Sequence, residues 1–396
     1  MSNKLILLLI PIKLREIDLI RYEVLDFEKK YGHSVEIHEL IDLLYPKFSE
    51  AFQNNINDKR LKNFDSFIDW KKRFRELLKK YGKDIVVIKN ISNTNLNCIK
   101  VNHELKINKV KVVEFSTLGF PHLPLDLSIK NIYQNIYRFI SDKKKLISFL
   151  KQKLLPIMVK FLKLYPTHVI QVGSLGVPKH YELKKINVIK GNSFDYNMYL
   201  KDEEDKNNHD YSDYGLFLEA PSPLFQGDSY LLGEDKSRMG TPEKWFPSIN
   251  NFFKLIENTL KIKIKIAPHP KVKHKLNPEY YFGREIVNKP LSKVVKKSKI
   301  IISRDSAGFA YAAIHKIPAI FIYTNELLVK KGFLKQQRHY ANELGLKPIN
   351  IDDDINEELL KELFKYDKKK YSKYVNKYST CRDDKKRNFE LINEIF

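Results

Sequence analysis

Residues 300–308, IIISRDSAG, pass from a β-branched strand through a polar loop into the start of a helix. The strand pattern covers residues 299–302, and the helical pattern runs over residues 306–315. A buried strand that leads through a short loop into a helix is the repeating unit of parallel α/β folds. The stretch therefore predicts a parallel sheet covered by helices.

The same alternation continues on both sides of this unit. Further strand patterns in the second half of the chain occupy residues 214–218, 263–267 and 319–323. Strand patterns in the first half occupy residues 4–12, 84–88, 110–115, 167–172 and 186–190. Apolar residues recur at helical spacing in residues 15–31, 64–81 and 245–260, the last of these opened by Thr241 as cap and Pro242. The whole chain is therefore expected to be α/β.

One segment interrupts the alternation. Residues 201–210, KDEEDKNNHD, contain no apolar side chain, which is typical of a linker. A chain of 396 residues is long enough for two domains of ordinary size. We therefore expect an N-terminal Rossmann-like domain over residues 1–200, a linker over 201–210, a second Rossmann-like domain over 211–380 and a closing helix over 381–396.

Basic residues clearly outnumber acidic ones. The sequence holds 71 Lys and Arg against 48 Asp and Glu, which gives a formal net charge of +23. Such a surface attracts nucleotides, nucleic acids, anionic lipid headgroups and acidic glycans. The two cysteines, Cys98 and Cys381, belong to no CxxC or Cys/His cluster. A disulfide framework and a zinc ribbon are therefore unsupported, and the cysteine count suits a reducing cytoplasm.

The N-terminal apolar run, residues 5–10, is too short for a membrane span. Pro11 and a helical pattern follow it, where a signal peptide would need a small-residue cleavage site. The run fits a buried parallel strand better. We expect a cytoplasmic protein.

The first candidate site residue is His269, which lies between Pro268 and Pro270 directly after the strand at residues 263–267. Ligands of parallel sheets bind outside the carboxyl ends of the strands. Two prolines restrict the backbone around the imidazole. His269 can then donate to a phosphate oxygen or act as general acid toward a leaving phosphate. The alternative is a turn histidine without a catalytic or binding role.

The second candidate is the loop within residues 300–308. A helix start presents free N–H groups that favour an anion. Ser303 and Ser306 add hydroxyl donors, and the small Ala307 and Gly308 let a phosphate approach. Simple N-capping by Asp305 or Ser306 is the alternative.

Two further residues complete the candidate site. Arg284, preceded by Gly283, offers a rigid pair of donors for a phosphate, unless it is an ordinary surface arginine. Glu219 ends the strand at residues 214–218 and can accept hydrogen bonds from a ribose or an acceptor sugar. Its alternative is a loop or capping carboxylate.

Together these motifs resemble bacterial GT-B glycosyltransferases that use CMP-activated acidic sugars, such as sialyltransferases, polysialyltransferases and Kdo transferases. His269-Pro270 matches the His-Pro motif of those enzymes, and Ser303 with Ser306 matches their serine motif. Many relatives have a second hydroxyl residue where this chain has Ala307. The resemblance implies a GT-B fold, two Rossmann-like domains that face each other across a cleft. It also implies a nucleotide-sugar donor held by His269, Pro270, Gly283, Arg284, Ser303, Asp305, Ser306, Ala307 and Glu219.

In such transferases the catalytic base usually comes from the N-terminal domain. Glu114 and Asp195 are the candidates, because each lies at a strand end, although either can merely cap a loop. The resemblance implies no cofactor and no obligatory metal. The acidic run at residues 352–354 precedes a helical pattern and is interpreted as an N-terminal cap of that helix.

The acceptor is expected to be a surface glycan or a lipid-linked oligosaccharide of lipopolysaccharide or capsule biosynthesis. A basic, apolar helix predicted over residues 141–164 offers peripheral contact with the inner face of the membrane; an ordinary core helix is the alternative. Two other functions stay open. One is a CDP-glycerol glycerophosphotransferase like the teichoic acid polymerases, which share the same elements. The other is a basic nucleic-acid-binding protein, although no nucleic-acid-binding motif is present.

Overall fold

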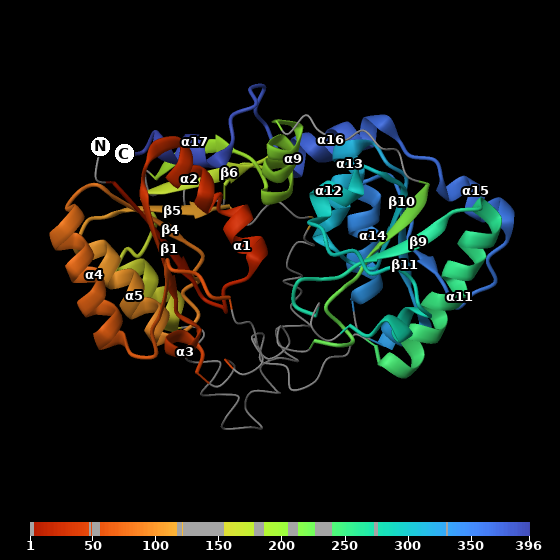
Figure 1. Cartoon of the computed structure of the whole chain (residues 1–396), viewed down its shortest axis with the longest axis horizontal. Helices are drawn as coiled ribbons and strands as arrows, with labels where there is room; N and C mark the ends of the chain where they lie inside the picture. The colour runs from red at the N-terminus through yellow and green to blue at the C-terminus, as the bar shows by residue number, and fades with distance from the viewer. Residues whose placement is uncertain are drawn as a thin grey trace.

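The computed structural model describes residues 4–46, 49, 56–116, 121, 154–177, 186–204, 213–225, 240–272, 276–329 and 332–396. Two parallel β-sheets lie side by side in it, and each is covered by helices (Figure 1). Each sheet has a hydrophobic cluster on either face. The predicted α/β architecture of two domains, each with its own parallel sheet, is therefore confirmed.

The first sheet has seven strands in the order β3-β2-β1-β4-β5-β6-β7. The strands span Leu5–Ile10 (β1), Ser34–Glu39 (β2), Leu61–Asn63 (β3), Ile85–Lys89 (β4), Lys111–Phe115 (β5), His168–Val172 (β6) and Asn187–Gly191 (β7). Every side chain of β1 is buried, because the strand is central and helices cover both of its faces. The N-terminal apolar run is thus a core strand, as predicted.

The helices of the first domain form two layers. One contains α4 (Phe67–Tyr81) and α5 (Leu96–Ile107), the other α1 (Glu16–Arg21) and α2 (Val24–Tyr31), and a short α3 spans Ile41–Leu44. The single helix predicted over residues 15–31 is wrong. Glu23 adopts a left-handed backbone with φ 51°, and this residue divides the segment into α1 and α2.

The second sheet has five parallel strands in the order β12-β11-β10-β8-β9. The strands span Tyr214–Leu218 (β8), Lys263–Ala267 (β9), Ser298–Ser303 (β10), Ala319–Tyr323 (β11) and Ile349–Asn350 (β12). Its helical elements are α11 (Pro242–Leu260), η3 (Pro278–Tyr281), α12 (Leu291–Val295), η4 (Ala307–Phe309), α13 (Ala310–His315), η5 (Asn325–Val329), α14 (Phe333–Glu343), α15 (Glu357–Leu363) and α16 (Lys368–Tyr378).

The N-termini of two helices, α11 and α15, are capped differently from the prediction. Thr241 is the N-cap of α11, but its hydroxyl donates to Glu326 Oε1 at 3.0 Å instead of capping the helix. The acidic run before α15 is not its cap. Asn356 accepts the capping hydrogen bond, while Asp352 and Asp353 accept from Asn325 N–H and from the amide of Asn350.

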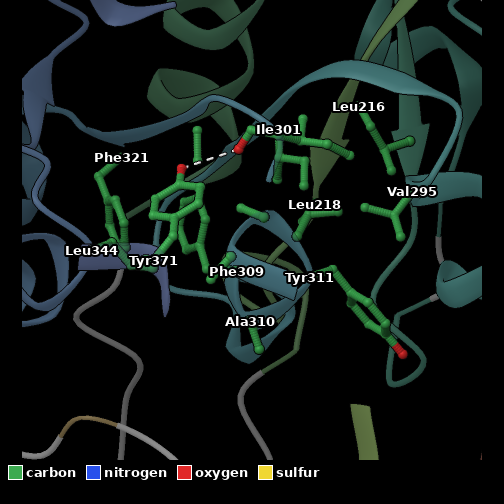
Figure 2. Close-up of a cluster of buried hydrophobic side chains, with 14 of the residues drawn as sticks. Leu216, Leu218, Val295, Ile301, Phe309, Ala310, Tyr311, Phe321, Leu344 and Tyr371 are labelled. Atoms are coloured by element: carbon green, nitrogen blue, oxygen red, sulfur yellow. Dashed lines mark hydrogen bonds between the residues drawn. The ribbon is translucent and has the colours of Figure 1, made fainter. Parts of the chain in front are cut away.

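One core cluster of the second domain packs around α13 (Figure 2). Phe309 stacks on Phe321 at 3.8 Å between ring centroids, and the buried Tyr371 donates to the Ile317 carbonyl at 3.0 Å. Tyr311 lies at the edge of the view in Figure 2, with its hydroxyl turned away from the cluster.

Helix α9 (Phe194–Glu204) connects the two domains. It packs against α1 of the first domain and against α12 and α13 of the second. The linker predicted over residues 201–210 is therefore partly wrong, because residues 201–204 complete α9. The rest of that predicted linker lies outside the described residues. The other predicted domain boundaries stay predictions.

The end of the chain returns to the first domain. Helix α17 (Asn388–Asn393) places Phe389 and Ile392 in the core cluster of α1 and α2. Arg387 donates to Glu23 Oε1 at 2.8 Å and to Asp26 Oδ1 at 3.0 Å. Both chain termini consequently lie on the same domain (Figure 1).

The basic helix predicted over residues 141–164 is described only from residue 154, and residues 154–161 are helical. Leu154, Ile157 and Phe161 are exposed, with Phe161 at 83%. An ordinary core helix is therefore not what these residues form. Within the described ranges, no helix is long and apolar enough to cross a membrane.

Candidate functional site

Three predicted site residues lie at the same edge of the second sheet. His269 follows β9, Glu219 follows β8, and Ser306 follows β10. All three strands are parallel, with β8 between the other two, so their carboxyl ends meet at one edge. Neighbouring strands lie about 4.8 Å apart, which separates the ends of β9 and β10 by about 10 Å. The topology thus brings the histidine, the carboxylate and the serine loop together.

The ring of His269 is held in one tautomer by the backbone. Its Nδ1 atom accepts a hydrogen bond of 3.2 Å from the backbone N–H of Lys271. An acceptor nitrogen carries a lone pair, so the proton of the neutral ring resides on Nε2. The side chain therefore presents an Nε2–H donor, and Pro268 and Pro270 fix the backbone on both sides.

Electrostatics keep this imidazole neutral. Burial, followed by the positive charges of Lys271, Arg15 and Arg21, lowers the pKa of His269 to about 3. Without a bound anion the ring therefore carries a single proton at neutral pH, and its role as general acid stays a prediction. The chemistry that remains is hydrogen-bond donation from Nε2. An anion bound against the ring would raise the pKa again by attraction.

Glu219 is buried beside this histidine, with 3% of its surface exposed. The hydroxyl of the fully buried Tyr281 donates to its Oε1 at 2.7 Å, while Oε2 is buried without a hydrogen bond of good geometry. Burial raises the pKa of Glu219 to about 7, although Tyr281, the His269 backbone and Arg304 act in the opposite direction. This carboxyl therefore titrates near neutral pH.

The loop after β10 is fixed by its own side chains. The Ser306 hydroxyl accepts from Gly308 N–H at 3.1 Å, as an N-cap does, and keeps its own proton for another partner. Arg304 is 1% exposed, lies over the Trp245 ring and donates to Asp305 Oδ1 at 3.1 Å. Ala307 is exposed. Asp305 is thus engaged by its neighbour, while Ser306 retains a donor.

Ser303 does not belong to the site. Its side chain is fully buried at the end of β10, and its hydroxyl donates to the Leu218 carbonyl at 2.7 Å. The hydroxyl proton is used inside the sheet, so it is not available to a donor molecule. The serine motif of the sequence therefore contributes one hydroxyl, that of Ser306.

Arg284 is also a structural residue. Its Nε and Nη2 atoms donate to the two carboxylate oxygens of Glu257 at 3.0 and 2.7 Å, and Nη1 donates to Asn250 Oδ1 at 2.7 Å. These bonds join the segment after η3 to helix α11, and with the bond from Nη1 to the Tyr281 carbonyl they use four of the five N–H donors of the guanidinium. Gly283 has φ +74° directly before it and is exposed. The predicted phosphate contact of Arg284 is therefore wrong.

The two candidate bases have different surroundings. Glu114 forms an ion pair with the buried Lys89, with 2.5 Å between Oε1 and Nζ, and Lys89 also donates to Asn102 of α5. This pair lies toward the α4 and α5 face of the first sheet. Asp195 instead lies at the start of α9, between the two domains. Burial raises the pKa of Asp195, against the charge of Arg21 and a hydrogen bond from Tyr311.

The sequence gives no signal for two residues at this place. Arg21 ends the short helix α1, and Tyr311 lies on α13 of the other domain. Neither residue lies in a motif, and only the packing of α9 against both helices brings them near Asp195. Among the described residues, no group of three or more His, Cys, Asp or Glu side chains could hold a metal ion.

Comparison with known proteins identifies the fold. No protein-family model matches the chain, and no curated protein matches it. Of the solved structures, the wall teichoic acid polymerase TagF aligns with 100% of this chain and 88% of its own, at 11% identity and a TM-score of 0.50. The UDP-GlcNAc 2-epimerase from Methanocaldococcus jannaschii aligns over 99% of both chains, at 14% identity and a TM-score of 0.48. The spinosyn rhamnosyltransferase SpnG, solved with thymidine diphosphate, aligns over 94% of both chains, at 10% identity and a TM-score of 0.41.

The protein thus has the GT-B fold, two Rossmann-like domains with separate parallel sheets, as the sequence predicted. At these identities the likeness defines the architecture, and the chemistry has to be argued from the site itself.

Proposed function

We propose that this protein is a glycosyltransferase that moves a sugar from a nucleotide donor to a surface glycan or lipid-linked acceptor. The favoured donor is a CMP-activated acidic sugar, such as a sialic acid, another nonulosonic acid or Kdo. The observation that carries the proposal is the fixed Nε2–H donor of His269 at the carboxyl end of β9. This edge of a parallel sheet is where nucleotides bind in Rossmann-like domains.

The proposed reaction uses these groups without a metal. An acceptor hydroxyl attacks the anomeric carbon of the donor, and negative charge develops on the leaving phosphate. His269 Nε2–H and the Ser306 hydroxyl donate hydrogen bonds to that phosphate, and preorganised donors of this kind stabilise developing charge. Asp195 is the proposed base, since its raised pKa makes it a better proton acceptor than an exposed aspartate.

A second candidate is a glycerophosphotransferase that uses CDP-glycerol. The structural alignment with the teichoic acid polymerase TagF, over the whole of this chain, favours it. Both reactions place a cytidine nucleotide phosphate against His269, so the nucleotide alone does not separate them. The two reactions differ in the group that is transferred, a sugar in one and glycerol phosphate in the other.

Calorimetric titration with CMP, CDP, UDP and GDP tests the donor class. We expect CMP to bind, and His269→Ala to weaken its affinity about tenfold to a hundredfold, the value of a hydrogen bond to a charged group. His103→Ala, a histidine on α5 of the first domain, is the matched control. If UDP or GDP binds and CMP does not, the donor assignment is wrong although a nucleotide site remains. If none binds, the proposed function is wrong.

Turnover with CMP-N-acetylneuraminic acid and with CDP-glycerol separates the two candidates. Release of CMP from the acidic sugar donor alone supports the glycosyltransferase. Release from CDP-glycerol alone supports the second candidate. Asp195→Asn should lower the turnover and leave CMP affinity within twofold, because a base acts on the acceptor.

The exposed apolar side chains of residues 154–161 support peripheral membrane contact of the same enzyme. Leu154, Ile157 and Phe161 recur at helical spacing, and Lys160 and Lys163 lie beside them. An apolar stripe with flanking lysines binds anionic lipid surfaces. Phe161→Ser should reduce co-sedimentation with phosphatidylglycerol vesicles relative to Ile68→Ser, an exposed apolar residue at 78% on α4. Equal sedimentation would contradict this part of the proposal.

A further inference from the structure

Helix α1 carries an arginine with no partner at the place where the two domains meet. Arg21 Nε is buried and has no hydrogen bond. In the described part of the chain the Arg21 guanidinium forms no ion pair, whereas Arg15, the N-cap residue of the same helix, pairs bidentately with Asp18 at 2.8 and 2.6 Å. Arg21 as a whole is half-buried, and a buried N–H such as its Nε–H is costly without an acceptor, since the desolvated donor loses water and gains nothing.

The surroundings of Arg21 come from both domains. Its charge acts on Asp195 of α9, on Tyr311 of α13 and on His269 after β9. α1 packs against α9, and α9 packs against α13, so these contacts are continuous (Figure 1). Arg21 therefore faces the same space as the histidine that the proposed function assigns to the donor.

The hydroxyl of Tyr311 lies in the same space. Tyr311 is 1% exposed, and its hydroxyl reaches Asp195 only through a contact of poor hydrogen-bond geometry. Figure 2 shows the hydroxyl directed out of the hydrophobic cluster. The buried Nε of Arg21 and the poorly bonded hydroxyl of Tyr311, one on each domain, leave hydrogen-bonding capacity for an added acceptor between them.

Asp195 does not fill this role. It forms no ion pair with Arg21 within 4.0 Å in the described structure, and burial opposes its ionisation. On the other side, Lys271 and Arg15 add positive charge around His269. The charges that act on His269 are all positive, so an anion would be attracted beside this ring, while Tyr311 also has the carboxylate of Asp202 near it.

We propose that Arg21 binds an anionic group of the donor, a phosphate or a sugar carboxylate, which Tyr311 and His269 contact from the second domain. The inference rests on the proposed function and adds a residue of the first domain to the donor site. Because the guanidinium is planar and always charged, it can hold either anion with two parallel hydrogen bonds. Donor binding then joins the two domains through α1.

Calorimetric titration of the full chain with CMP, UDP, CMP-N-acetylneuraminic acid, UDP-glucose and UDP-glucuronic acid tests this. Arg21→Gln should lower the affinity for the best-bound probe at least about tenfold, which is the value of a charge-assisted pair. Arg75→Gln removes the same charge from an exposed site on α4 and should change affinity less than twofold. Arg21→Lys should retain part of the affinity.

The probes separate the two sources of the anion. An equal loss for CMP and for its acidic sugar conjugate assigns Arg21 to the phosphate. A loss confined to the carboxylate-bearing probes assigns it to the sugar. Wild-type affinity of Arg21→Gln for every probe overturns the inference and leaves the proposed function intact. If the wild type binds none of the probes, both are overturned.

Tyr311→Phe provides a second variant, in case Arg21→Gln does not fold. It removes one hydroxyl and should lower the affinity several-fold at unchanged unfolding temperature. Unchanged affinity in Tyr311→Phe would contradict the shared site. If Arg21 only balances the charge of Asp195, the double variant Arg21→Gln/Asp195→Asn regains stability and binds every probe like the wild type, which also overturns the inference.

Discussion

The phenolic hydroxyl of Tyr281 donates a 2.7 Å hydrogen bond to Oε1 of Glu219, and both side chains are almost completely buried. The pair lies directly behind His269, because β8 and β9 are neighbours in the sheet. A carboxyl that titrates near neutral pH thus lies beside the histidine of the candidate donor site.

Glu219 makes stability depend on pH. Its pKa is about 7 in the folded chain against an ordinary value of 4.5, so between these values the folded chain keeps a proton that the unfolded chain has lost. This contribution to stability is complete below pH 4.5 and is lost as the pH rises through 7. Since one pKa unit corresponds to about 1.36 kcal/mol, the loss is at most about 3 kcal/mol.

Glu219→Gln should remove this dependence. The free energy of unfolding of the variant, minus that of the wild type, should grow between pH 4.5 and pH 7 and then stay constant. Urea unfolding at several pH values measures it. Other titrating groups are the same in both proteins and cancel in the difference. A difference that is flat across this range would contradict burial of a neutral carboxyl.

The two serines of the β10 loop should behave differently. Ser306→Ala removes the hydroxyl that still has a free proton, and should weaken nucleotide affinity several-fold besides costing about 1 kcal/mol as a lost cap. Ser303→Ala should destabilise the protein by about 1–2 kcal/mol and leave nucleotide affinity unchanged, because its hydroxyl is bound to Leu218. Calorimetric titration and thermal unfolding of both variants check this. Loss of affinity in Ser303→Ala alone would reverse the assignment.

Arg284 should matter for stability and not for the donor. Arg284→Met leaves the Glu257 carboxylate without its bidentate partner, and we expect a loss of about 2–3 kcal/mol in the free energy of unfolding. Nucleotide affinity should stay within twofold. In a double-mutant cycle, the loss in Arg284→Met/Glu257→Gln should be smaller than the sum of the two single losses. Weaker nucleotide binding at unchanged stability would return Arg284 to the site.

At Gly173 the first domain closely approaches α16 of the second domain. A Cβ atom on this residue would lie 2.2 Å from the carbonyl oxygen of Lys377 in α16, and its φ of +68° already disfavours other residues. Gly173→Ala should therefore force the first domain away from α16 and destabilise the protein by more than 1 kcal/mol. Gly176→Ala, with φ +79° and nothing within 4 Å, is the matched control for backbone strain. Equal losses in the two variants would show that the close approach is relieved without cost.

The sequence predicts the strands of this fold well and the directions of its polar side chains less well. Buried parallel strands are continuous apolar runs, and for this reason the pattern at residues 319–323 coincides with β11. Ser303 and Ser306 look alike in the sequence, yet one faces the sheet and the other the loop. Arg284 looked available because its acid partner, Glu257, lies 27 positions earlier on α11. No sequence pattern marks Arg21, because its surroundings depend on α9 and on α13, a helix of the other domain.

The return of α17 to the first domain has a consequence for how the chain matures. Phe389 belongs to the same core as Phe27, and Arg387 neutralises Glu23 there. The hydrophobic core of the first domain is therefore completed only after residues 387–393 have been synthesised. Until then the first domain has an incomplete hydrophobic core, and the second domain can fold before the first has completed its folding.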